Sequence, residues 1–251
     1  YKKAKKVITV GNGLKNEIQA LSGRNDIEVI GNLVDLSKFT IKKRIQNEKF
    51  IFFSLAFLEG EKGFDTLIKA FAKKFKDKEA MLYIGGDGSQ RAWLEALAQE
   101  NGVKKQIIFL GALSRDDVAK WMNKCDCFVF PSIYEGLGNV VLEALACGIP
   151  VISTDCPYGP KEILDPNNVF EITNKHDGEY GVLVPAFQDE GMDFSLKIEK
   201  NEEILANAII EILTDKGKKE WYRAQAIRRS IFFKPENIQH QWIDLIEEVR
   251  Q

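Results

Sequence analysis

The stretch Pro131–Pro150, PSIYEGLGNVVLEALACGIP, decides the fold of this chain. It follows the apolar run Cys127–Phe130 directly, and another apolar run begins at Val151. Between the two runs, the glycines of EGLG predict a turn. NVVLEALA then predicts a helix that begins near Asn139 and stops at Gly148. Strand, turn, helix and strand in this order form the repeating unit of a parallel α/β sheet.

The same alternation continues on both sides of this stretch. Many of the apolar runs are continuous rather than alternating, which is typical of parallel strands covered on both faces. Amphipathic segments separate them, such as the stripe Phe64, Leu67, Ile68, Phe71 and Phe75. We therefore predict a doubly wound parallel α/β sheet. Strands are expected at residues 7–10, 27–30, 50–55, 80–84, 107–110, 127–130, 151–153 and 182–184.

The pattern changes after Pro185, where three helices are predicted and no convincing strand separates them. The second of these helices is expected to bury Trp221, Ala224, Ile227 and Ile231, and the third covers residues 236–250. An earlier stripe joins Trp93, Ala96 and Leu97. Residues 165–180 and 187–200 are predicted as polar, irregular segments.

Composition excludes several classes of function. The chain has 251 residues with 35 basic and 37 acidic side chains, so nucleic acid is not expected as its main partner. No uncharged stretch approaches the ~20 residues of a membrane span. The two histidines are far apart in sequence, which argues against a histidine metal site. The four cysteines lack zinc-site spacing and are predicted to be small buried residues of a protein in a reducing compartment: Cys125, Cys127, Cys147 and Cys156.

Residues 135–143 combine two carboxylates with a helix start. In a parallel sheet, Glu135 lies at the carboxyl edge, where ligands bind. The amides of residues 136–140 begin the helix and suit a phosphate group. Glu135 and Glu143 would repel phosphate, but they could accept hydrogen bonds from sugar hydroxyls on either side of it. That arrangement fits a nucleotide sugar. The alternative is that Glu135 closes a turn and Glu143 is a surface helix residue.

Two other glycine-containing turns follow predicted strands. The turn at residues 85–89 fails the G-x-G-x-x-G pattern because Arg91 stands at the third glycine position. It is better explained as a tight turn in which Ser89 caps the next helix. In the turn at residues 59–63, Lys62 could supply a cation to a diphosphate, although a lone lysine is usually solvated.

These segments together resemble the donor-binding half of a GT-B glycosyltransferase from the large retaining family four, also described as glycosyl transferases group 1. The resemblance covers nearly the whole chain. It is carried, in order, by IEVIGNLVDLSKF with Asn32 and Asp35, by EKGFDTLIKAF, by YIGGDGSQRAWLEALA, and by the long run from IIFLGALSRDD to GIPVIST. Glu135 and Glu143 match the E-x7-E signature of that family.

The resemblance implies roles for individual residues. Glu135 would contact the donor hexose and Glu143 the nucleotide ribose, while Lys62 would pair with the diphosphate. Catalysis would rest on Glu135 and Lys62. The family commonly has an arginine where this chain has Phe57, so Lys62 would carry more of the diphosphate charge. Further donor-binding positions would be Gly111 and Leu113 near the base and Gly136, Leu137, Gly138 and Asn139 near the hexose and phosphate. No D-x-D motif is present, so neither a metal nor another cofactor is expected.

The resemblance also implies a division of the chain. Residues 1–34 would be a remnant of the acceptor lobe and its linker, residues 35–187 the Rossmann-like donor lobe, and residues 188–251 the C-terminal helices. The last helix would cross toward the missing N-terminal acceptor lobe. The chain begins with Tyr1 rather than Met. We therefore expect a piece of a longer enzyme, able to bind a donor weakly but unable to turn it over.

The expected partners are a nucleotide-sugar donor and a glycan or lipid-linked acceptor. The segment CPYGPKEIL resembles enzymes of surface polysaccharide assembly that use hexose or N-acetylated hexosamine donors. A cytoplasmic location is expected. The basic residues Lys2, Lys3, Lys5 and Lys6 either form a solvated segment or attract the chain to the inner face of a membrane.

Two other functions remain open at this point. One is a non-catalytic nucleotide-sugar-binding or scaffold lobe, although such a lobe would not need both glutamates. The other is a sugar-nucleotide epimerase, which shares the GT-B architecture. The E-x7-E element and the scarcity of histidines argue against the epimerase.

Overall fold

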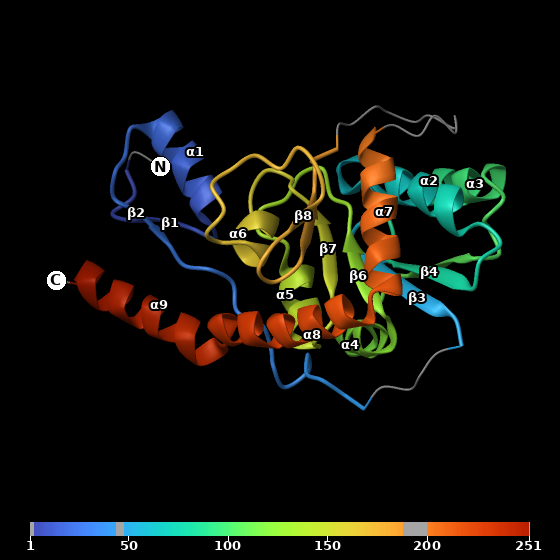
Figure 1. Cartoon of the computed structure of the whole chain (residues 1–251). Coiled ribbons are helices and arrows are strands. Elements are labelled where there is room, and N and C mark those ends of the chain that lie inside the picture. The colour runs from blue at the N-terminus through green and yellow to red at the C-terminus, as the bar shows by residue number, and fades with distance from the viewer. Residues whose placement is uncertain (1–2, 44–47, 188–199, 251) are drawn as a thin grey trace.

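The computed structural model describes residues 3–43, 48–187 and 200–250 (Figure 1). The helices are α1 Asn12–Ser22, α2 Phe64–Phe75, α3 Arg91–Glu100, α4 Arg115–Lys124, α5 Asn139–Ala146, α6 Pro160–Leu164, α7 Lys200–Thr214, α8 Lys216–Ser230 and α9 Pro235–Arg250, with 3-10 turns η1 Gly60–Lys62 and η2 Ile231–Phe233. The strands are β1 Val7–Thr9, β2 Ile27–Val29, β3 Phe50–Leu55, β4 Ala80–Gly85, β5 Ile107–Gly111, β6 Cys127–Phe130, β7 Val151–Thr154, β8 His176–Asp177 and β9 Val182–Val184.

The main sheet has the strand order β5-β4-β3-β6-β7-β9-β8, and only β8 runs antiparallel to its neighbour. The chain starts at the centre with β3, moves outward through β4 and β5, and then returns to place β6 on the other side of β3. This reversal makes a topological switch point between β3 and β6, the place where open α/β sheets bind ligands. The predicted doubly wound sheet is confirmed.

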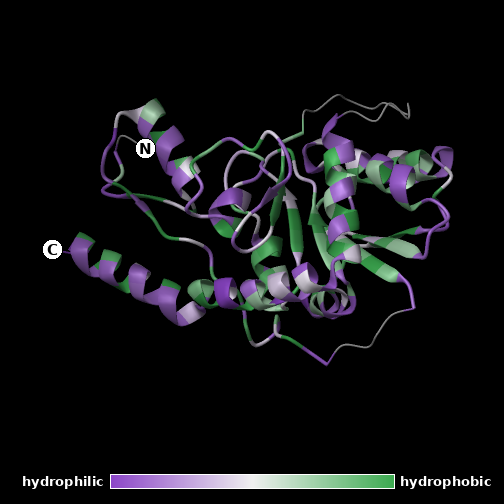
Figure 2. Cartoon of the chain, in the orientation of Figure 1, coloured by the Kyte–Doolittle hydropathy of each residue, from purple (hydrophilic) through white to green (hydrophobic). Residues whose placement is uncertain are grey.

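Helices cover both faces of the sheet, as strands that are apolar on both sides require. On one face, α2, α3 and α7 pack on Phe52, Leu82 and Val129. On the other face, α4, α5 and α8 pack on Phe53, Phe128 and other strand residues. Figure 2 shows this arrangement as hydrophobic strands between helices that are hydrophilic on their outer sides. The four cysteines are all buried, as predicted.

An N-terminal unit lies beside the main sheet and consists of β1, α1 and β2. Its two strands pair in parallel, separately from the main sheet. Helix α9 leaves the main body and runs toward this unit (Figure 1). Ile30, which follows β2, packs against Ile238 and Leu245 of α9. Lys6 forms ion pairs with Glu28 at 2.6 Å and with Glu248 of α9 at 2.7 Å. The last helix is therefore seated on the N-terminal unit.

Several local predictions were wrong. In α8, the buried side chains include Tyr222 and Gln225, whereas the four residues predicted to be buried are all exposed: Trp221, Ala224, Ile227 and Ile231. The helix is rotated from its predicted face because the Tyr222 hydroxyl donates to the carbonyl of Gly178. In α3, Leu94 and Ala98 are buried with Leu97, while Ala96 is exposed.

The polar segment 165–180 contains β8, which was not predicted. Most of the predicted loop 187–200 lies outside the described residues, as does Lys2.

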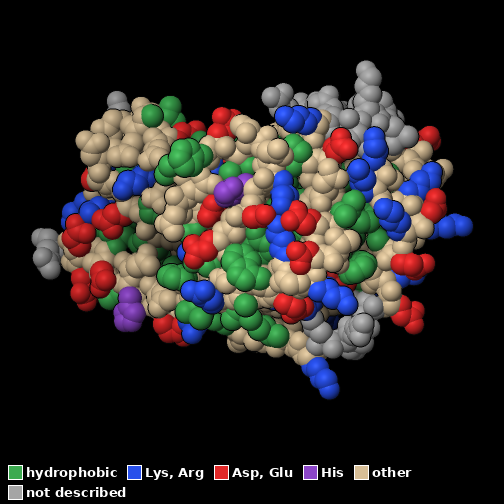
Figure 3. Space-filling model, in the orientation of Figure 1, with side chains coloured by type: hydrophobic (Ala, Val, Ile, Leu, Met, Phe, Trp, Pro, Cys, Tyr) green, Lys and Arg blue, Asp and Glu red, His purple; other side chains and the backbone are tan. Residues whose placement is uncertain are grey.

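The exterior carries charges of both signs, interspersed over the face seen in Figure 3. None of the helices in the described ranges combines the length and apolar character that crossing a bilayer requires. The described residues also contain no group of three or more His, Cys, Asp or Glu side chains arranged to hold a metal ion.

Candidate functional site

A cavity of about 490 Å³ lies at the switch point, and we call it the switch-point cavity. It is formed by the segments that follow β3, β4, β5 and β6, at the carboxyl edge of the sheet. Its lining residues are Leu55, Ala56, Phe57, Lys62, Gly86, Asp87, Ala112, Leu113, Val118, Phe130, Glu135, Gly138, Asn139 and Val140. The predicted residues Lys62, Leu113, Glu135, Gly138 and Asn139 thus meet in one cavity. Gly111, Gly136, Leu137 and Glu143 do not line it.

Lys62 and Glu135 form an ion pair in this cavity. The distance from Lys62 Nζ to Glu135 Oε1 is 2.8 Å, and the side chains are 16% and 15% exposed. Ser132 donates its hydroxyl to the same oxygen at 2.8 Å. Both bonds use Oε1, so within the described part of the chain Oε2 keeps its capacity to accept. The carboxylate is held in one orientation and can still bind a hydroxyl group.

Gly63 explains why Lys62 reaches Glu135. Its φ is +62°, and a Cβ at this position would lie 2.2 Å from the carbonyl oxygen of Pro131. Only glycine permits so close a contact in this conformation. The amide of Ile133 also donates to Glu61 at 2.8 Å, which joins η1 to the segment after β6. These contacts place the lysine turn directly against the glutamate loop.

Helix α5 begins beside this pair. Its N-cap is Gly138, with φ +84°, and no side chain of the described residues caps the helix there. The first amides of α5 therefore present a partial positive charge beside a cavity that Gly138, Asn139 and Val140 line. A Cβ on Gly136 would meet nothing within 4 Å. Leu137 is buried and packs in the apolar core, so its side chain does not enter the switch-point cavity.

Glu143 lies one turn into α5 and faces α4. Its carboxylate pairs with Arg115 at 3.2 Å, and its side chain is 12% exposed. Burial raises the pKa of Glu143, while the Arg115 charge opposes this shift. The pairing of Glu143 with a nucleotide ribose stays a prediction.

The turn after β4 closes the far side of the cavity. Gly86 has φ +111°, and a Cβ there would lie 1.9 Å from the carbonyl oxygen of Ala56. Its amide donates to the carbonyl of Gly111 at 2.8 Å, so Gly111 joins this turn to the end of β5. The turn is tight, as predicted, but the prediction that Ser89 caps the next helix was wrong. Ser89 donates its amide to Glu59 at 2.9 Å, and Gln90 is the N-cap of α3.

Two other side chains complete the description of the site. Phe57, where the resemblance would place an arginine, lines the cavity and is 77% exposed. Lys62 is thus the only basic residue among the described lining residues, which include the acidic Asp87 and Glu135. Burial and then the Glu135 charge raise the pKa of the Cys156 thiol to about 12. That thiol is protonated at neutral pH and is a poor nucleophile.

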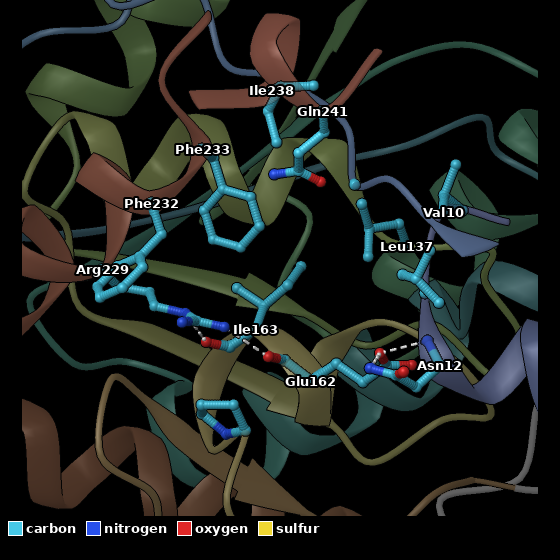
Figure 4. A pocket seen from close by; sticks show the side chains of 14 residues that line it. Val10, Asn12, Leu137, Glu162, Ile163, Arg229, Phe232, Phe233, Ile238 and Gln241 are labelled. Atoms are coloured by element: carbon cyan, nitrogen blue, oxygen red, sulfur yellow. Dashed lines mark hydrogen bonds between the residues drawn. The ribbon is translucent and has the colours of Figure 1, made fainter. Parts of the chain in front are cut away.

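A second cavity of about 300 Å³ lies where the N-terminal unit meets the main body, and we call it the junction cavity (Figure 4). Glu162 of α6 accepts hydrogen bonds from the amides of Asn12 at 2.6 Å and Gly13 at 2.9 Å. Arg229 of α8 donates to the carbonyls of Ile163 and Glu162 at 2.9 and 2.7 Å. The lining residues are Val10, Gly11, Asn12, Val29, Gly31, Leu137, Glu162, Ile163, Pro166, Arg229, Phe232, Phe233, Ile238 and Gln241.

Sequence analysis missed four polar contacts around the site. These are the bonds of Ser132 to Glu135, Asn32 to Asn139, Arg115 to Glu143 and Glu162 to α1. Ser132 could have been found, because it precedes Glu135 by three residues in the same loop. The others join residues that are distant in sequence, and no local pattern reports them.

Comparisons with known proteins agree with this geometry. The family model described as Glycosyl transferases group 1 matches residues 37–229. An uncharacterized glycosyltransferase of Methanocaldococcus jannaschii is 33% identical over 246 residues, which are 93% of this chain and 58% of that protein. The N-acetylgalactosamine-N,N'-diacetylbacillosaminyl-diphospho-undecaprenol 4-alpha-N-acetylgalactosaminyltransferase of Campylobacter jejuni is 30% identical over 72% of this chain and 46% of its own length. The chain spans about half the length of the curated relatives it matches.

Solved structures share the fold. Sucrose-phosphate synthase from Thermosynechococcus elongatus aligns with a TM-score of 0.80 and 23% identity over 98% of this chain and 59% of that one. Anabaena HepE, solved in complex with UDP and glucose, aligns with a TM-score of 0.77 and 20% identity over 98% of this chain and 64% of that one. The expected GT-B lobe architecture is confirmed.

Proposed function

The chain belongs to the group 1 glycosyltransferase family, and we propose that it is the donor-binding part of a retaining glycosyltransferase. The proposed donor is a nucleoside-diphosphate hexose or N-acetylhexosamine, and the proposed acceptor is a glycan or lipid-linked glycan of surface polysaccharide synthesis. The printed names of the Campylobacter relative and of a lipopolysaccharide core biosynthesis glycosyltransferase from Rhizobium meliloti support this acceptor class. The observation that carries the proposal is the meeting of Lys62, Glu135 and the start of α5 in one cavity.

The diphosphate would lie between Lys62 and the first amides of α5. Departure of the nucleoside diphosphate leaves negative charge on the leaving phosphate. A fixed cation and fixed N–H groups stabilise such charge without having to reorganise. Lys62 is already held by Glu135, so the pair is organised before the ligand arrives. We propose that the leaving phosphate itself takes the proton of the acceptor hydroxyl, which attacks from the same face and retains the configuration.

Glu135 would bind the donor hexose through Oε2, since Oε1 is used by Lys62 and Ser132. Glu143 would bind the ribose, and the segment Ala112–Leu113 would contact the base. We propose that no metal takes part, because Lys62 and the amides supply the positive charge, and that the reaction takes place in the cytoplasm.

Ligand-induced thermal stabilisation tests the proposal directly. A panel of UDP, GDP and ADP and their sugars is added to the purified chain, with and without EDTA. At a concentration 100 times its Kd, a ligand adds about 2.7 kcal/mol to the free energy of unfolding. For a chain of this size, each kcal/mol raises the Tm by roughly 2–4 °C. We expect one nucleotide of the panel to raise the Tm, and we expect EDTA to leave that rise unchanged.

Lys62→Ala is the matching variant, and Lys49→Ala is its control. Lys49 pairs with Glu79 on the surface, away from the cavity. We expect Lys62→Ala to weaken diphosphate binding by about 10- to 100-fold, since bonds to charged groups contribute about 1.5–3 kcal/mol. Equal binding by the two variants would contradict the proposed site.

A separate proposal is that this chain alone binds the donor without transferring sugar. Acceptor-dependent transfer by the purified chain would contradict that proposal and leave the donor site intact. Binding without transfer in every natural form of the protein would instead favour the non-catalytic lobe.

A further inference from the structure

We propose that Asn32 is a positioning residue that orients the side chain of Asn139, so that the Asn139 amide donates hydrogen bonds into the switch-point cavity. The inference rests on the proposed function, because it assigns those N–H groups to the diphosphate of the donor. Asn32 follows β2, on the segment that joins the N-terminal unit to the main sheet. Asn139 is the first residue of α5 and lines the cavity.

The contact between the two amides fixes the direction of Asn139. Asn32 Nδ2 donates to Asn139 Oδ1 at 2.7 Å. An amide side chain carries its acceptor and its donor on opposite edges. Once Oδ1 is bound by Asn32, the two N–H bonds of Nδ2 are the ones left for a ligand. Within the described part of the chain, Nδ2 of Asn139 has no hydrogen-bond partner.

Asn32 is itself held in place from both directions. Two residues before it, the amide of Ile30 donates to the carbonyl of Thr9 at 2.9 Å. Two residues after it, the amide of Val34 donates to the carbonyl of Phe233 at 2.9 Å. Ile30 and Val34 are 3% and 2% exposed. The five-residue segment is therefore anchored at both ends, which keeps the Asn32 side chain within reach of Asn139.

The charge balance of the cavity explains why the orientation matters. The described lining residues include two acids, Asp87 and Glu135, and one base, Lys62, which is paired with Glu135. A diphosphate entering this cavity needs further donors. Turned by 180°, the Asn139 amide would instead present its carbonyl oxygen to the phosphate and repel it. The bond from Asn32 holds the opposite orientation, in which the Asn139 amide offers its N–H groups.

A double-mutant cycle on the full chain tests this coupling. UDP, GDP and ADP are titrated calorimetrically against wild type, Asn32→Ala, Asn139→Ala and the double variant. We expect each single variant to lower the affinity for the nucleotide that wild type binds by about three- to tenfold, the range expected for one hydrogen bond. In the Asn139→Ala background, Asn32→Ala should have no further effect. An Asn32→Ala loss as large in that background as in wild type would overturn the inference.

Asn32→Asp adds a test of direction with almost no change in shape. A carboxylate only accepts, so it should turn Nδ2 of Asn139 toward itself and its carbonyl toward the cavity. We expect Asn32→Asp to weaken binding more than Asn32→Ala does. In the Asn139→Ala background this excess should shrink to the effect of the added charge alone. An equal excess in both backgrounds would contradict the proposed rotation.

The control variant is Asn12→Ala, which removes another side-chain bond between the N-terminal unit and the main body, the 3.2 Å bond from Asn12 Nδ2 to Glu162. It should leave nucleotide affinity unchanged. Thermal unfolding of all variants separates binding from folding. Absence of nucleotide binding by wild type would overturn the proposed function as well. This inference alone would be overturned if Asn32→Ala and Asn32→Asp bound the nucleotide as wild type does, while Lys62→Ala lost affinity.

Discussion

Helices α1 and α5 both begin at a glycine N-cap without a side-chain cap of their own, and they differ in what lies at that end. At α1, the Glu162 carboxylate of α6 accepts from the amide of Asn12 (Figure 4) and from the amide of Gly13. At α5, no described side chain takes that place, and the helix starts at the wall of a larger cavity. The protein supplies its own anion to one helix, whereas no described side chain supplies one to the other.

The same contrast separates the two cavities. In the junction cavity, Glu162 and Arg229 form their hydrogen bonds with groups of the chain itself, most of them backbone groups. In the switch-point cavity, Oε2 of Glu135 and Nδ2 of Asn139 have no partner among the described residues. A cavity becomes a candidate site through the polar groups that it leaves available, and the switch-point cavity combines such groups with the cation of Lys62 and the start of α5.

The largest expected effect comes from replacing Glu135. Glu135→Gln should lower the turnover of the enzyme that carries this chain by about 100-fold or more, because a charge fixed at the reacting sugar is lost. Its stability should change little, since glutamine keeps an oxygen for Lys62 and Ser132. Initial rates with saturating donor measure this effect. Near-normal kcat would remove Glu135 from the mechanism.

The next effect comes from giving α5 a cap of its own. Gly138→Asp places a carboxylate at the helix N-terminus, where it should compete with a diphosphate for the first amides. Gly138→Ala is the control for backbone strain, because Gly138 has φ +84° and a Cβ there would lie 3.2 Å from Phe130. We expect nucleotide affinity to fall about tenfold further in Gly138→Asp than in Gly138→Ala. Equal affinities would show that α5 does not bind the anion.

Removing the cap of α1 should affect stability instead. Glu162→Ala leaves the first amides of α1 without their partner, and loss of such a cap costs about 0.5–2 kcal/mol. The Tm should fall by a few degrees, while nucleotide affinity stays the same. Thermal unfolding and calorimetric titration of one preparation measure both quantities. A large loss of affinity would mean that the two helix ends are not independent.

The smallest effect concerns the pH dependence of stability at Glu143. Burial raises its folded pKa above the ordinary value of 4.5, so folding favours the protonated form. The stabilisation is complete below that ordinary value and is lost as the pH rises through the folded pKa. Glu143→Gln cannot ionise. It should therefore gain stability relative to wild type between acidic and neutral pH, and a constant difference in Tm across that range would contradict this.

The sequence was sufficient to predict those elements that depend on a local pattern of residues. The continuous apolar runs located the main strands, and the glycine turn before Asn139 located the start of α5. Lys62 and Glu135 were both placed at the same sheet edge by the order of strands and helices alone. That edge is where the structure brings their side chains within 2.8 Å.

The sequence was insufficient to predict contacts and buried faces that depend on a residue far away in the chain. The face of α8 depends on Tyr222 reaching Gly178, in a segment that had no predicted structure. Asn32 and Asn139 are 107 positions apart, and Glu162 and Asn12 are 150 apart. These contacts arise only after the sheet, the linker and the C-terminal helices have assembled, so no periodicity in the chain reports them.

Strand β8 also has a practical consequence. It closes one side of the main sheet with two residues, His176 and Asp177, in antiparallel pairing with β9. Lys175 and Lys218 both pair with Asp177 beside it, at 3.0 and 2.6 Å. A short, charged border of this kind offers an incoming chain almost no template for strand addition. Concentrated samples for titration should therefore resist self-association through this border.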